Sequence, residues 1–164
     1  MNTATDAPNS LMQETYPALQ LIQPLREQLL ELLTDDDLAF ALPGNPTLGS
    51  LCRELAEVQA GYTQSFRTFT MTNGPHTDRP DIAQQVAALA AWYHTLDQEL
   101  AATLAALSEA DIHERVIERP GFAVPPSTNL HLYREALFIF YGKVTVYLNA
   151  LGKPLPPQWA TWIG

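Results

Sequence analysis

The sequence predicts an all-α protein whose helices form a four-helix bundle, and three observations lead to this fold class. Apolar residues recur at alternating steps of three and four, the spacing of one helix face. Proline, glycine and acidic residues separate the periodic stretches, and no internal repeat or strand pair with hairpin chemistry is visible. Four amphipathic helices joined by modest loops bury their apolar faces against one another. The expected helices are 11–33, 45–70, 80–107 and 128–151.

The first expected helix carries leucines and an isoleucine on one side and contains two prolines. Pro17 fits near a helix start, whereas Pro24 should bend or divide the helix, because proline has no amide hydrogen to donate to the preceding turn. The acidic run 35–37 should end this helix in a loop that reaches Gly44.

The second expected helix has a strong start signal, with Asn45 as the cap and Pro46 at the first helical position. Gly61 lies inside its apolar stripe and should mark the close approach of a neighbouring segment. The third expected helix is rich in alanine, which raises helix propensity and allows tight packing.

The fourth expected helix is the one that the others should cover. Ser127 can cap its start, and Gly152 stands where a left-handed C-terminal cap belongs. The segment 108–126 before it is a long crossover, which its prolines should keep extended after a short turn. Its apolar stripe consists of Leu130, Tyr133, Leu137, Phe140, Val144, Tyr147 and Leu151.

The two ends of the chain differ in character. Residues 1–10 are polar, and we expect a mobile leader there, followed by a single domain at 11–164. The large apolar ring of tryptophan is usually buried, also when the residue lies close to a chain end. We therefore expect Trp159 and Trp162 to pack on the bundle as a C-terminal cover.

Composition excludes several classes of function. The net charge of −9, with no cluster of Lys or Arg, argues against nucleic-acid binding. No apolar run is long enough to span a bilayer, and the first residues do not form a signal peptide. The single cysteine, Cys52, cannot form an internal disulfide, which suits the cytoplasm.

Two stretches together resemble the DinB-like (YfiT-like) family of bacterial four-helix bundles. The segment TLGSLCRELA at 47–56 is similar to the family segment that carries a histidine before Leu-Ala, and YGKV at 141–144 with the following Leu-Gly and prolines is similar to the family ending. The resemblance covers roughly 11–160 and implies that the second and third helices run in the same direction. Residues 71–79 would then cross the bundle nearly extended, covering roughly 30 Å at about 3.3 Å per residue.

The family resemblance also implies a metal held by three histidines, but the corresponding positions here are Glu54, Ala136 and Phe140. Only Glu54 could bind a metal, and Lys143 stands where the family has glutamine, so its charge would oppose a divalent ion. We expect no metal and no cofactor. A pocket at this former metal position would be formed by Glu54, Ala136, Phe140, Lys143 and Tyr147.

No other residues form a convincing chemical site. His131 and Glu135 have the spacing of a chelating pair, yet both lie away from the Phe140 direction and are more simply surface residues. Cys52 is more simply a buried, inert thiol, although the adjacent Arg53 would lower its pKa if it were exposed. The scattered residues His76, His94, His113, Glu114 and Glu118 lack metal-ligand spacing.

Three functions follow as hypotheses. The first is a non-catalytic, metal-free bundle that binds a small molecule or a partner. The second, implied by the family, is a metal-dependent thiol transferase or isomerase. The third is a structural homodimer, with Phe138 and Ile139 supplying an apolar patch.

One contact should replace the metal. A buried carboxylate without a partner costs several kcal/mol or takes up a proton. We expect Lys143 to reach Glu54, directly or through water, with Arg134 as the alternative cation. The competing interpretation is that Glu54 turns to solvent.

Overall fold

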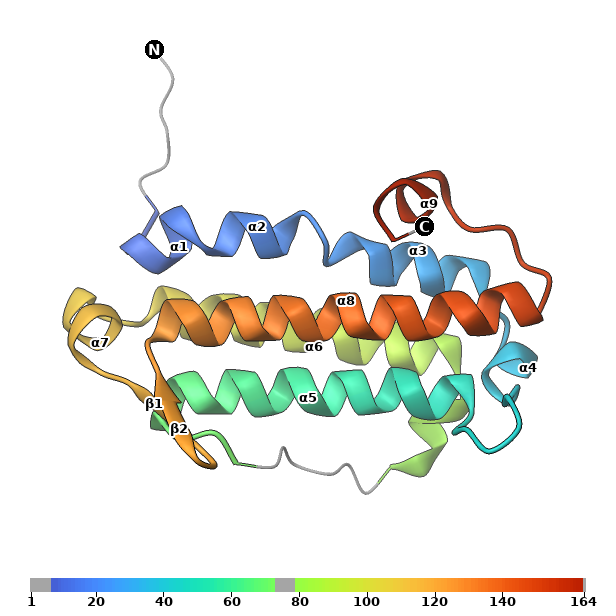
Figure 1. The fold of residues 1–164 in the computed structure, drawn as a ribbon, viewed down its shortest axis with the longest axis horizontal. Helices are drawn as coiled ribbons and strands as arrows, with labels where there is room; N and C mark the ends of the chain where they lie inside the picture. Colours follow the sequence, from blue (N-terminus) through green and yellow to red (C-terminus); the bar gives the residue numbers. More distant parts are fainter. Residues whose placement is uncertain (1–6, 73–78, 164) are drawn as a thin grey trace, which may run out of the picture.

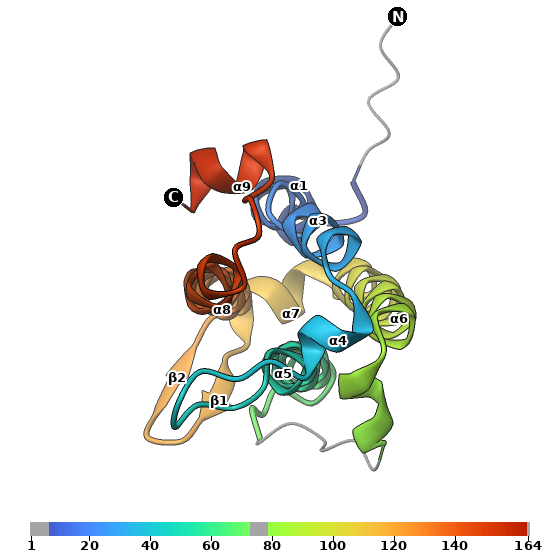
Figure 2. The same ribbon diagram turned by 90° about the vertical axis from the view of Figure 1, so that its right-hand side faces the viewer.

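Three long helices, α5 (Leu48–Thr68), α6 (Val86–Ala105) and α8 (Pro126–Ala150), lie side by side along the long axis of the molecule (Figure 1). The computed structural model describes residues 7–72 and 79–163. Seen from the end, α5, α6, α8 and the rod formed by the first helices surround a common core (Figure 2). The predicted all-α bundle is confirmed, with one small hairpin added to it.

The first rod is divided into α1 (Ser10–Glu14), α2 (Tyr16–Gln20) and α3 (Pro24–Leu32). The predicted break at Pro24 is therefore confirmed, and a second break precedes Pro17, since proline cannot continue the hydrogen-bond ladder of the preceding turn. Contacts with the bundle also begin earlier in the chain than predicted. Asn9, assigned to the leader, is 6% exposed, and its side-chain amide donates to the carbonyl of Leu104 at the end of α6 (2.8 Å).

The acidic run after α3 is not the loop that we predicted. It forms a short helix, α4 (Asp35–Leu38), because Thr34 and Asp37 make a reciprocal capping box. The Asp37 carboxylate accepts from the backbone and the hydroxyl of Thr34, each at 2.7 Å. It also pairs with Lys153 at 2.8 Å, which ties the chain after α8 to α4.

The cap of α5 is Thr47 and not Asn45. The Thr47 hydroxyl accepts from the amide of Ser50 (3.1 Å), whereas the Asn45 side chain donates to the carbonyl of Pro43 (2.9 Å) in the preceding turn. Close approach occurs at Gly49. A Cβ there would lie 1.8 Å from the carbonyl oxygen of Ala83 in the 3₁₀ helix η1 (Pro80–Gln84).

Helices α5 and α6 run in the same direction, as the family resemblance implies. Gly49 at the start of α5 meets η1, which leads into α6, and Arg67 at the end of α5 donates to Thr103 near the end of α6 (3.0 Å). In Figure 1 the colours of both helices change from right to left in the order of the colour bar, so both helices run from right to left. Residues 73–78 of the predicted extended crossing lie outside the described part of the chain.

The crossover contains two strands that were not predicted. After α7 (Glu109–Glu114), strands β1 (Ile117–Arg119) and β2 (Phe122–Val124) pair as an antiparallel hairpin. Gly121 has a φ of +87°, which supplies the left-handed conformation that the tight turn requires. Backbone hydrogen bonds between Phe69 and Glu118 (3.0 Å) and between Met71 and Glu118 (2.7 Å) hold the hairpin against the end of α5.

Helix α8 begins at Pro126, two residues earlier than predicted, with Pro125 and not Ser127 as its N-cap. Its end is confirmed: Gly152 has a φ of +67°, and the amide of Lys153 donates to the carbonyl of Leu148 (2.9 Å), as in a Schellman cap. No helix in the described part of the chain is long and apolar enough to cross a membrane.

The C-terminal cover is confirmed for one tryptophan and wrong for the other. Trp159 in α9 (Pro157–Trp162) is fully buried, its indole donates to the Thr145 hydroxyl (3.0 Å), and its ring packs on Tyr141. Trp162 is 44% exposed. Residues three apart share one side of a helix, so the two rings differ in burial because of their place along α9, of which Trp162 is the last residue.

Candidate functional site

A buried ion pair joins α3 to α6. Arg26 is only 2% exposed, and its Nη2 donates to Oδ1 of Asp97 at 2.6 Å. Nη1 donates to the side-chain oxygen of Gln59 on α5. The same Oδ1 accepts from Gln59 (2.7 Å) and from Gln23 (3.0 Å). Side chains from α3, from Gln23 just before it and from α5 thus converge on one carboxylate oxygen of α6.

Tyrosines surround this pair. The Arg26 guanidinium lies 4.5 Å from the centre of the Tyr93 ring. Burial raises the pKa of Tyr93, Tyr133 and Tyr141, so their hydroxyls stay protonated. Burial alone would lower the pKa of Arg26, but the neighbouring Tyr133 and Asp97 more than offset it, and that pKa lies above its usual range. Arg26 is therefore a permanent cation in the core.

Two buried polar atoms of this cluster have no hydrogen-bond partner in the described residues. They are Nε of Arg26 and the hydroxyl of Tyr133. Tyr141 differs, because its hydroxyl donates to the carbonyl of Ile22 (2.7 Å). Unpaired polar atoms in a core cost free energy, because each has given up its hydrogen bonds to water.

The sequence contains a signal for this cluster that we did not use. Arg26 lies four residues after Ile22 and three before Leu29, which are both core residues. Gln59 likewise lies four residues after Leu55 and three before Tyr62. Asp97 lies four residues after Tyr93 and three before Leu100, and all four of these neighbours are core residues. Each polar residue thus occupies a position of an apolar stripe, where a polar side chain needs a partner.

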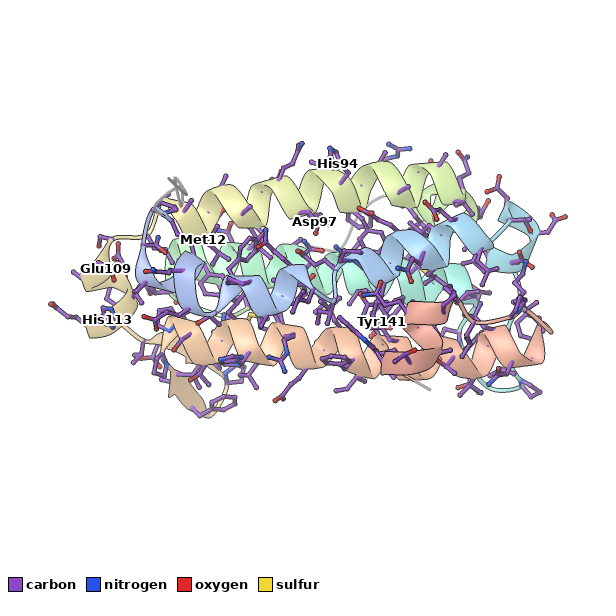
Figure 3. All side chains as sticks on the ribbon, turned by 90° about the horizontal axis from the view of Figure 1, so that it is seen from above. Met12, His94, Asp97, Glu109, His113 and Tyr141 are labelled. Carbon is purple, nitrogen blue, oxygen red and sulfur yellow. The ribbon has the colours of Figure 1, made fainter. Side chains whose placement is uncertain are left out.

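The ion pair forms part of the wall of a pocket of about 350 Å³ between α3 and α6. In Figure 3, Asp97 lies between α6 and the first rod. The Asp97 side chain is 29% exposed and that of Arg26 is 3% exposed, so the pocket reaches the carboxylate from solvent. The lining residues are Arg26, Glu27, Leu30, Glu31, Val86, Ala90, Tyr93, His94 and Asp97.

The site predicted from the sequence is a smaller groove of about 150 Å³ between α5 and α8. Glu54, Ala136, Phe140 and Lys143 all line it, together with Leu51, Leu55, Val58 and Ile139. Tyr147 does not. Its hydroxyl donates to the carbonyl of Pro46 (2.7 Å), and its ring meets Phe40 edge-on.

The expected ion pair in this groove is not formed. Among the described residues, neither Lys143 nor Arg134 makes an ion pair or hydrogen bond with Glu54. Glu54 and Lys143 are both exposed, so water solvates each charge and no burial penalty forces them together. The competing interpretation, a solvent-facing Glu54, agrees with its exposure.

The donor set of the groove does not fit the metal that the DinB-like resemblance implies. Glu54 is its single anionic donor, and Lys143 adds a positive charge. No group of three His, Cys, Asp or Glu side chains within the described residues could hold a metal ion. His131 and Glu135 are exposed, His94 contacts Gln98 and His113 contacts Glu109, while His76 lies outside the described residues.

Comparison with solved structures decides the fold. A DinB-like protein from Bacillus cereus superimposes with a TM-score of 0.74 at 18% identity, over 88% of this chain and 95% of that one. The chain has the DinB-like fold. The DinB-like protein YjoA from Bacillus subtilis matches with a TM-score of 0.65 at 17% identity, over 82% of this chain and 90% of that one.

At these identities, the likeness concerns the DinB-like fold and not the chemistry of a site. No family model and no curated protein sequence matches the chain. The predicted fold is thus confirmed by three-dimensional similarity, while the side chains of the chain itself must carry any functional argument.

Proposed function

We propose that this protein is a non-catalytic, metal-free bundle of DinB-like fold that binds a small molecule in the pocket between α3 and α6. The observation that carries the proposal is the Arg26–Asp97 pair, in which the arginine is buried in the bundle while both side chains line a pocket. Well-packed apolar residues would stabilise a bundle as well as a buried ion pair does, so stability alone does not account for it. A few convergent polar groups in an apolar cavity are typical of a ligand site, and about 350 Å³ is within the usual range of about 300–1,000 Å³.

A fragment screen by ligand-observed NMR on the full chain tests the proposal. Ala90 lines the pocket and is exposed, so Ala90→Phe should fill the space without disturbing the core. Hits should disappear with Ala90→Phe and persist with the control Ala91→Phe, because Ala91 is exposed on the same helix and does not line the pocket. A screen without hits, or hits that survive Ala90→Phe, would contradict the proposed site.

The α5–α8 groove of Glu54, Ala136, Phe140 and Lys143 is the second candidate site for the same binding function. Hits lost with Ala136→Phe and kept with Ala90→Phe would assign binding there. The metal-dependent enzyme remains the opposing hypothesis, and it has a direct measurement. Stoichiometric zinc or nickel that survives dialysis of the purified chain would support it over the metal-free proposal.

A homodimer is a separate proposal, and one observation favours it. Ile139 is 61% exposed and Val146 is 55% exposed, and they lie seven residues apart on the outer face of α8 with the exposed Gly142 between them. Such a strip can pack against the same strip of a second copy. Sedimentation at micromolar concentration should give a dimer that Ile139→Glu dissociates. A monomeric wild-type chain would remove the proposal.

A further inference from the structure

The chemistry of the pocket between α3 and α6 indicates the class of its ligand. We infer that it takes a small organic cation, namely a primary ammonium group carried on a short apolar chain. The inference rests on the proposed function and adds the charge and shape of the ligand. Four features of the pocket support it: the neutralised arginine, two unpaired carboxylates, one free carboxylate oxygen and an apolar wall.

The cation already present in the pocket uses both of its terminal nitrogens on Gln59 and Asp97, and its unpaired Nε is buried away from solvent. Arg26 is paired with Asp97 at 2.6 Å, and its guanidinium stacks on the Tyr93 ring. Glu27 and Glu31, one helical turn apart on α3, also line the pocket and are exposed. Neither forms a hydrogen bond or ion pair with any described residue. The lining of the pocket therefore carries three carboxylates and one guanidinium, and this excess of negative charge attracts a cation.

Asp97 keeps capacity to accept further hydrogen bonds. All three of its hydrogen bonds, from Gln23, Arg26 and Gln59, go to Oδ1. No described residue donates to Oδ2, although a carboxylate accepts about four hydrogen bonds in all. An ammonium group has three donors and no acceptor, so it can satisfy Oδ2 while it faces the glutamates.

The remaining wall of the pocket favours an organic cation over a metal ion. Leu30, Val86, Ala90 and the Tyr93 ring are apolar surfaces that an alkyl chain can cover. A hard divalent ion needs about six oxygen ligands, whereas no group of three acidic or metal-binding side chains comes together in the described residues. The occupant should therefore be amphipathic, with a charged head and an apolar tail.

Calorimetry on the full chain with three matched probes tests the inference. Hexylammonium, 1-hexanol and hexanoate share one alkyl chain and differ in the charge of the head group. Hexylammonium should bind about tenfold more tightly than hexanol, since two unpaired carboxylates each add a modest attraction, and hexanoate should not bind. Added salt should weaken hexylammonium binding and leave hexanol binding unchanged.

Variants locate the effect. The double variant Glu27→Gln/Glu31→Gln should reduce hexylammonium affinity about tenfold without changing hexanol affinity. The control Glu135→Gln, an exposed glutamate on α8, should change neither. If hexanol or hexanoate binds as tightly as hexylammonium or more tightly, and Ala90→Phe abolishes that binding, the cation inference is overturned and the proposed function stands. Binding that survives Ala90→Phe would overturn both, and no binding of hexylammonium would overturn the cation inference.

Discussion

Arg26 of α3 and Asp97 of α6 form an ion pair with 2.6 Å between Nη2 and Oδ1, and Arg26 is only 2% exposed. The two residues are 71 positions apart in the chain, so the contact exists only in the folded bundle. It joins two helices, contributes the charged wall of a pocket and leaves Oδ2 of Asp97 open.

Removing one partner of this pair should destabilise the fold strongly. Arg26→Met leaves the Asp97 carboxylate and the Gln59 side chain without their buried partner, which should cost about 3–5 kcal/mol of unfolding free energy. Urea denaturation measures the loss. The matched control is Arg53→Met, because the Arg53–Glu57 pair is longer (3.7 Å) and the Arg53 side chain is 33% exposed against 3% for Arg26, and it should cost about 1 kcal/mol or less. Equal losses in the two variants would contradict the role given to the Arg26 pair.

Two glycines in helices should respond to alanine in opposite directions. Gly49→Ala places a Cβ 1.8 Å from the Ala83 carbonyl, so α5 and η1 must separate and the melting temperature should fall. Gly142→Ala on α8 meets nothing within 4 Å and should stabilise the protein by about 0.5–1 kcal/mol through helix propensity. Thermal denaturation compares the melting temperatures of both variants with that of the wild type. A higher melting temperature for Gly49→Ala would rule out the close approach of α5 and η1.

The two tryptophans of α9 should differ in their contribution to stability. Trp159→Ala removes a fully buried ring and its hydrogen bond to Thr145, at a cost of about 3–5 kcal/mol. Trp162→Ala changes a side chain that is 44% exposed and should stay within about 0.5 kcal/mol of wild type. Chemical denaturation compares them. If Trp162→Ala were the costlier change, the docking of α9 would be wrong.

Cys52 should be unreactive in the native protein. It is completely buried, and burial raises the pKa of its thiol from an ordinary value of 9.0 to about 12. A disulfide reagent at pH 8 should therefore label Cys52 only in denaturant. Because the folded pKa is the higher one, the thiol contributes stability that is complete below pH 9.0 and is lost as the pH rises to about 12. Cys52→Ala should reduce that alkaline loss, and rapid labelling of the native chain would contradict the burial.

Short-range features of the chain were predictable because they depend on residues close in sequence. The break at Pro24 and the end of α8 at Gly152 follow from a missing amide and a left-handed glycine. The misassigned features were those with competing local signals. Asn45 and Thr47 are both good caps, and in the structure Thr47 caps α5 while Asn45 bonds to the preceding turn.

The sequence by itself determined the helical periodicity, the places where helices stop and the resemblance to the DinB-like fold. It also placed Glu54, Ala136, Phe140 and Lys143 beside one another, because the spacing along α8 and the family pattern suffice for that. Only the tertiary structure decided which polar residues meet. Arg26, Gln59 and Asp97 come from three helices, and each resembles an ordinary polar residue within its own helix. Burial couples them, since a charge removed from water must find its partner wherever the packing of the helices places it.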